Sequence, residues 1–118
     1  MKKLAFLFFV LQILIGCSKS NDSSNEPNVD MPPGNFSVTM DEVYDKSTII
    51  VWTASKDPEN INVKYDVYLN EELVASQLQT LTYTFTELSP EISYNGKVVA
   101  SDGSNSTTIN FSFTTQAL

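Results

Sequence analysis

From Phe36 to the end of the chain, inward and outward positions alternate with a period of two residues. This period constrains the fold more than any other feature, because successive side chains of a β-strand point to opposite faces, whereas a helix repeats every 3.6 residues. Turn-forming stretches such as 56–60 and 101–105 separate the alternating runs. We therefore predict an all-β sandwich of short, half-buried strands. The expected inward positions are Phe36, Val38 and Met40; Thr48, Ile50 and Trp52; Val63, Tyr65, Val67 and Leu69; Leu81, Tyr83 and Phe85; Tyr94, Val98 and Ala100; and Ile109, Phe111 and Phe113.

Several of these runs, read together, resemble a fibronectin type III domain. The resemblance spans roughly residues 33–115 and implies an immunoglobulin-like antiparallel β-sandwich of about seven strands. An immunoglobulin-like sandwich with another topology is the alternative. The residues that carry the resemblance are Ile50-Val51-Trp52, Tyr65-Asp66-Val67-Tyr68, Tyr83 to Pro90, Tyr94 with Val98-Val99-Ala100, and Phe111 to Thr115.

The resemblance also implies roles for four core residues. Trp52 and Tyr65 are expected to be neighbours in the core, and Leu88 is expected to plug it. Tyr94 is expected to donate or accept a hydrogen bond with upstream backbone, as the tyrosine-corner residue does. Gly96 departs from the family pattern, which usually places a large apolar side chain there. Either a neighbour such as Trp52 fills that space, or the strand bulges at this point.

The first seventeen residues have the organisation of an export signal. Lys2 and Lys3 precede an apolar run, residues 4–15, that is interrupted only by Gln12 and is too short to span a bilayer as a helix. The run ends at Gly16-Cys17, which resembles the lipobox of bacterial lipoproteins. The resemblance implies a signal peptide at 1–16, cleavage after Gly16, and a lipid on Cys17 that anchors the protein to a membrane. An uncleaved apolar anchor, or a secreted protein with an incidental Cys17, are the alternatives.

Residues 17–34 form the predicted tether, and residues 35–118 form the predicted domain. The tether is polar and rich in proline, and it carries too little apolar surface to order itself; a role as a peptide ligand is the alternative. Ser18 follows the lipidated cysteine, where the inner-membrane retention signal has Asp. This favours the outer membrane, with the domain in the periplasm or at the cell surface.

The charge and residue types exclude several functions. Without residues 1–16, five lysines stand against fourteen acidic residues, a net charge of −9, which argues against a nucleic-acid partner. The chain has no His, so the usual acid–base catalyst and metal ligand is missing. The adjacent acids Glu71 and Glu72 fit a solvated turn better than a glycosidase pair. We expect no enzyme activity, no cofactor and no metal. The oxygen-bearing side chains of Asp57, Glu59, Asn60 and Asn62 nevertheless leave calcium binding in the loop 57–62 open.

The outward positions of two predicted strands suggest one interaction face. Exposed aromatic and apolar side chains beside charged ones form binding patches in other proteins, although scattered exposed apolar residues are also ordinary. We expect a non-enzymatic envelope module that binds a protein or glycan, or acts as a spacer. The alternative is an accessory subunit of an outer-membrane complex for polysaccharide uptake or secretion. The candidate face consists of Lys64, Asp66, Tyr68, Lys97 and Val99.

Overall fold

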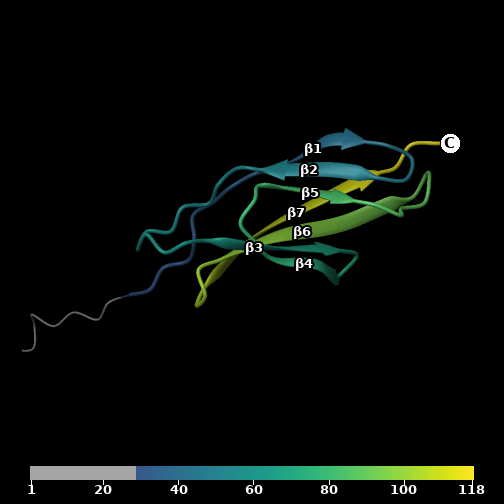
Figure 1. Ribbon diagram of the computed structural model, residues 1–118. Coiled ribbons are helices and arrows are strands. Elements are labelled where there is room, and N and C mark those ends of the chain that lie inside the picture. The colour runs from purple at the N-terminus through teal and green to yellow at the C-terminus, as the bar shows by residue number, and fades with distance from the viewer. Residues whose placement is uncertain (1–28) are drawn as a thin grey trace, which may run out of the picture.

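The computed structural model describes residues 29–118, and these form a sandwich of two antiparallel sheets (Figure 1). The predicted signal peptide, Cys17 and most of the tether lie outside the described residues. One sheet has the order β1-β2-β5 and the other the order β4-β3-β6-β7. The predicted all-β sandwich of about seven strands is therefore confirmed. The strands are β1 (Val38–Val43), β2 (Thr48–Trp52), β3 (Lys64–Leu69), β4 (Glu72–Leu78), β5 (Thr82–Phe85), β6 (Ser93–Ser101) and β7 (Ser106–Thr114).

The core lies between the two sheets and follows the predicted alternation except at Leu81. This residue was predicted to point inward, but it precedes β5 and is 39% exposed. In β2, positions 48, 50 and 52 are buried while 49 and 51 are partly exposed. The same pattern holds in β3, where Tyr65 and Val67 are buried. Burial of this apolar layer supplies most of the stabilising free energy of such a domain. The buried apolar residues are Phe36, Ile50, Trp52, Tyr65, Val67, Phe85, Leu88, Val98, Ala100 and Phe113.

One strand has no counterpart in the sequence prediction. β4 forms the edge of the larger sheet, and five of its seven residues are exposed. Its pairing with β3 shifts register twice, and Gln77 within it has a φ of 58°. A bulged edge strand that is exposed on both faces shows no apolar alternation, because no consistent face is buried. Periodicity alone therefore could not reveal it.

The space beside Gly96 is filled by a neighbouring side chain, which was one of the two expected alternatives, but this neighbour is Phe111 and not Trp52. Gly96 pairs directly with Phe111 in an uninterrupted β6–β7 register, so β6 has no bulge there. A Cβ atom at position 96 would lie 2.7 Å from Cε1 of Phe111 and 2.7 Å from the carbonyl oxygen of Tyr68. A glycine is required here because the aromatic ring takes the volume of the missing side chain.

The segment before β1 packs along one end of the sandwich. Gly34 N–H donates to the carbonyl of Lys56 at 2.8 Å, and Pro33 is buried. Asn105 Nδ2 donates to the carbonyl of Asp30 at 3.0 Å. Residues 30–34, the end of the predicted tether, therefore contact the loops of the domain. Within residues 29–118 there is no helix with the length and apolarity needed to cross a membrane.

Candidate functional site

The structure brings the five residues of the candidate face together on one side of the larger sheet. Asp66 in β3 pairs with Val99 in β6, and Tyr68 pairs with Lys97. Lys64 lies at the start of β3, on the same face, opposite Ser101. All five side chains alternate with the buried positions of their strands and are partly exposed. The five predicted residues therefore form one continuous surface.

A groove of about 520 Å³ opens at the end of this face where β3 turns into β4. Tyr68 and Lys97 both line it, and the Lys97 ammonium lies 4.7 Å from the centroid of the Tyr68 ring. This separation is in the range of a cation–π interaction. Amide groups from the turn, β6 and β7 surround the pair, so the groove offers both donors and acceptors. It is lined by Tyr68, Asn70, Glu71, Asn95, Gly96, Lys97, Asn110 and Phe111.

The turn that borders the groove is a strained two-residue connection. Asn70 and Glu71 join β3 to β4, with φ angles of 49° and 72°. Two consecutive positive φ values are typical of the type I′ hairpin, which prefers Gly at the second position. Asn70 is locked by backbone pairing, since its N–H donates to the carbonyl of Asn95 at 2.6 Å and its Oδ1 accepts from the N–H of Asn95 at 3.0 Å. The two neighbouring acids of the sequence thus occupy a turn and an edge, with Glu72 beginning β4.

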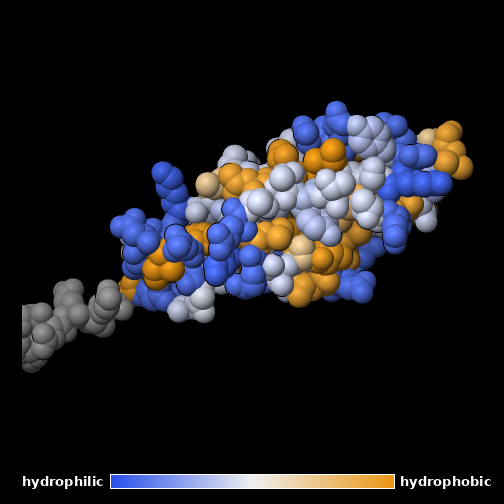
Figure 2. All heavy atoms as spheres, viewed as in Figure 1, coloured by the Kyte–Doolittle hydropathy of each residue, from blue (hydrophilic) through white to orange (hydrophobic). Residues whose placement is uncertain are grey.

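Apolar side chains extend the candidate face onto the edge strand. Leu73 pairs with Tyr68 and is 49% exposed, and Val74 is 38% exposed. Figure 2 shows apolar side chains gathered over the region of β3 and β4, beside hydrophilic ones at the end where the N-terminal segment lies. Exposed apolar side chains of β4 therefore lie next to a groove with a mixed polar and aromatic lining, and such a combination is common in binding surfaces.

At the opposite end of the face, two loops carry buried carboxylates. Asp57, in the loop between β2 and β3, accepts the N–H groups of Glu59 at 2.8 Å and Ile61 at 3.2 Å through Oδ2. Asp102, after β6, accepts the N–H groups of Asn105 at 2.7 Å and Ser104 at 2.8 Å through Oδ1. The backbone donors of Asn105 and then Ser104, with a smaller contribution from the Asp57 side chain, lower the pKa of Asp102.

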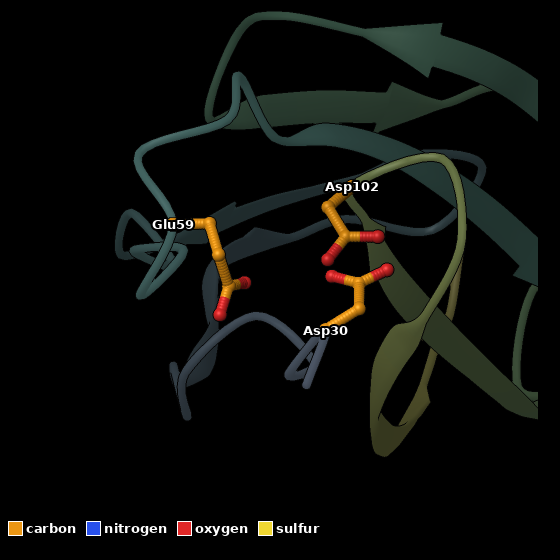
Figure 3. Close-up of side chains that lie close together, drawn as sticks. All are labelled: Asp30, Glu59 and Asp102. Carbon is orange, nitrogen blue, oxygen red and sulfur yellow. The ribbon is translucent and has the colours of Figure 1, made fainter. Parts of the chain in front are cut away.

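Three carboxylates from different segments meet at these loops (Figure 3). Asp30 precedes β1, Glu59 lies between β2 and β3, and Asp102 lies between β6 and β7; one oxygen of each is within 4.8 Å of those of the others. The sequence singled out Asp57, Glu59, Asn60 and Asn62 as oxygen ligands, but only Glu59 of these belongs to the three-carboxylate group. Asn60 instead forms the turn, with its N–H donating to the carbonyl of Asp57 at 2.9 Å. Asp30 and Asp102 were missed because no spacing rule connects residues 72 positions apart.

The four residues assigned to the core hold the two sheets and their loops together. Trp52 and Tyr65 are buried neighbours with ring centroids 5.5 Å apart. The hydroxyl of Tyr65 accepts the N–H of Ser55 at 2.9 Å, which fixes the loop that carries Asp57. Leu88 is buried, and the Tyr94 hydroxyl accepts the N–H of Ser89 at 2.9 Å. This last bond has the tyrosine-corner arrangement.

The family model described as "Fibronectin type III domain" matches residues 31–115. The chain belongs to the fibronectin type III family. A search of curated protein sequences gave no match. Fibronectin type III domains are typically non-catalytic modules that bind partners or act as spacers.

Solved structures share the fibronectin type III fold of this chain. The domain of human fibronectin type III domain containing protein 3 superposes with a TM-score of 0.60 at 19% identity, covering 80% of this chain and 94% of that chain. A chitinase from Bacillus thuringiensis gives a TM-score of 0.62 at 23% identity over 78% of this chain and 14% of that chain. A family 28 exopolygalacturonase from Yersinia enterocolitica gives 0.56 at 20% identity, over 75% of this chain and 21% of that chain. In both enzymes the similar part is a small fraction of the whole.

Proposed function

We propose that this chain is a lipid-anchored, non-enzymatic binding module of the cell envelope, and that the outer face of the β4-β3-β6-β7 sheet contacts its ligand. The observation that carries the proposal is the groove around Tyr68 and Lys97. It is open, it joins the face formed by β3 and β6, and its lining combines aromatic, amide and charged groups. The location at the membrane rests on the sequence of residues 1–17 alone.

The groove chemistry favours a glycan as the ligand. Asn70, Asn95 and Asn110 each place an amide at the groove, and an amide both donates and accepts hydrogen bonds, as sugar hydroxyls require. Tyr68 adds an aromatic ring, and Lys97 adds a positive charge to the groove of a protein whose net charge is negative. A sugar that carries a carboxylate would gain a charge-assisted hydrogen bond from Lys97. Similar domains within a chitinase and an exopolygalacturonase give this choice further support.

A second candidate is an accessory subunit that docks on a larger envelope complex. Leu73 and Val74 favour this alternative, because they expose apolar surface on an edge strand next to the candidate face. Edge strands are common sites of protein–protein pairing. In that case the same face would contact a protein, and no glycan would be needed.

The test uses the full-length chain, purified from membranes in mild detergent, against a panel of neutral and acidic oligosaccharides. We expect binding to at least one acidic glycan, weakened about tenfold or more by Tyr68→Ala or Asn110→Ala. Tyr44→Ala is the matched control, since Tyr44 is exposed and lies at the far end of β1. Binding that is unchanged in Tyr68→Ala would reject the sheet face.

Absence of glycan binding together with a stoichiometric co-purifying protein would support the accessory subunit instead. Release of that protein by Leu73→Ser would then place it on the edge strand. Both outcomes are read from the same purified sample.

A further inference from the structure

Three segments that are distant in the sequence converge on one point at the end of the sandwich. The oxygens of Asp30, Glu59 and Asp102 lie within 4.8 Å of one another, and Figure 3 shows the Asp102 carboxylate turned toward that of Asp30. Oxygens bound to one Ca²⁺ at about 2.4 Å are separated by at most about 4.8 Å. The three oxygens are therefore close enough to bind one shared cation.

A second observation, independent of this spacing, comes from the buried carboxylates behind the cluster. Asp57 is 7% exposed and Asp102 is 9% exposed. Each uses one oxygen to accept backbone N–H groups, while Asp57 Oδ1 and Asp102 Oδ2 have no partner among residues 29–118. A buried, unpaired carboxylate oxygen is costly, so such an atom generally meets a donor or a cation. The Asp57 side chain lies close enough to Asp102 to lower its pKa through a side-chain hydrogen bond, so these two buried carboxyl groups are neighbours.

We propose that Asp30, Glu59 and Asp102 bind one Ca²⁺ ion. The neighbouring carboxylate of Asp57 adds negative charge beside the site. Three or four carboxylates from one side leave further positions for water, which suits the six to eight oxygen ligands of calcium. Magnesium fits less well, because it demands near-octahedral geometry at about 2.0–2.1 Å and these ligands come from three separate segments. The backbone N–H groups of Ser104 and Asn105 bind Oδ1 of Asp102 and so fix the orientation of this carboxylate.

The ion would fasten the segment before β1 to the loops of the domain. Pro33 and Gly34 are already held, since the Thr107 hydroxyl donates to the Pro33 carbonyl and the Gly34 N–H donates to the Lys56 carbonyl at 2.8 Å. The attachment of residues 30 and 31 rests on fewer bonds. The N–H of Met31 donates to Glu59 Oε1 at 3.3 Å and Oε2 at 3.4 Å, and Asn105 Nδ2 donates to the Asp30 carbonyl at 3.0 Å. A calcium ion bound by Asp30 and by both loops would join all three segments at once. Calcium would thereby fix residues 30 and 31 against the two loops. This inference does not depend on what the sheet face binds.

The probe is CaCl₂ alone, added to the full-length chain in detergent after treatment with EDTA. Isothermal titration calorimetry should give one site with a Kd of about 0.1–1 mM, the range of extracellular calcium modules. At ten times Kd, calcium should raise the Tm by roughly 5–10 °C. Absence of both heat and a Tm shift at about 10 mM calcium, which is at least about a tenfold excess over the expected Kd, would overturn the proposal. An equal shift with Mg²⁺ would overturn the assignment to calcium.

Asp30→Asn is the decisive variant, because Asp30 is exposed and we expect its substitution to leave the fold intact. It should weaken calcium binding about tenfold or more. In EDTA, Asp30→Asn should be at least as stable as the unmodified protein, because the substitution removes repulsion between like charges. With calcium added, the unmodified protein should be the more stable of the two. Asp41→Asn removes the same charge from an exposed position of β1 and should leave the Kd unchanged. Equal calcium affinity in Asp30→Asn and Asp41→Asn would reject the site.

Discussion

Gly96 and Phe111 are paired across β6 and β7, and the ring of Phe111 occupies the volume that a side chain at position 96 would fill. The contact lies on the inner face, where Phe111 also packs against Phe85 with ring centroids 6.0 Å apart. The glycine and the aromatic ring therefore form one packing unit. A change at either position affects the other.

We expect Gly96→Ala to destabilise the domain by about 2–3 kcal/mol, the cost of overpacking a core. The added Cβ would approach the Tyr68 carbonyl oxygen as well as the ring, and backbone cannot move aside as a side chain can. The measurement is the free energy of unfolding in urea. Asn95→Ala, one residue earlier and exposed, is the control and should change stability by less than about 0.5 kcal/mol. Equal effects of the two substitutions would contradict this packing.

Glu71→Gly should stabilise the domain by about 0.5–1 kcal/mol, because glycine accepts a positive φ without the Cβ penalty. Glu71 has a φ of 72° at the second position of the turn. Glu72→Gly is the matched control, since the next residue is in β4, where glycine weakens a strand. Thermal unfolding of both variants checks the prediction, and a lower Tm for Glu71→Gly would show that the turn is not strained at this residue.

The stability of the domain should depend on Asp102 in acid. Its pKa is lowered in the folded state, chiefly by the backbone N–H groups of Asn105 and Ser104. The stability it contributes is therefore fully present above its unfolded pKa of about 3.9 and is lost as the pH falls through the lower folded value. Unfolding in EDTA between about pH 5 and pH 2 should show a steeper loss of stability in the unmodified protein than in Asp102→Asn. Parallel curves would contradict the assignment.

Cys17→Ala should release the protein from the membrane fraction, because the lipid on this residue is the predicted anchor. Mass spectrometry of the unmodified protein should show a chain that begins at Cys17 and carries acyl groups. A Cys17→Ala protein that stays in the membrane with residues 1–16 attached would support an uncleaved apolar anchor. Its appearance in the medium at the same level as the unmodified protein would support secretion with an incidental cysteine.

The period of two residues was enough to predict the sandwich and most of its core. Alternation identifies a strand when one of its faces is buried, as in β2 and β3, where Ile50 and Val67 are fully buried. β4 was not predicted, because its residues face solvent on both sides and bulges interrupt its register, so its sequence shows no alternation. The sequence also indicated that Gly96 is unusual, but it did not predict that the Phe111 ring fills the space beside this glycine.

The candidate face could be predicted from the sequence, whereas the three-carboxylate group could not. Tyr68 and Lys97 were assigned to one face from strand parity, since neighbouring strands of a sheet share their alternation. The meeting of Asp30 with Asp102 has no local pattern in the sequence. It arises only when the segment before β1 and the loop after β6 are brought to the same end of the sandwich. Local side-chain alternation is determined by the backbone of each strand, whereas contacts between loops are determined by the packing of the whole domain.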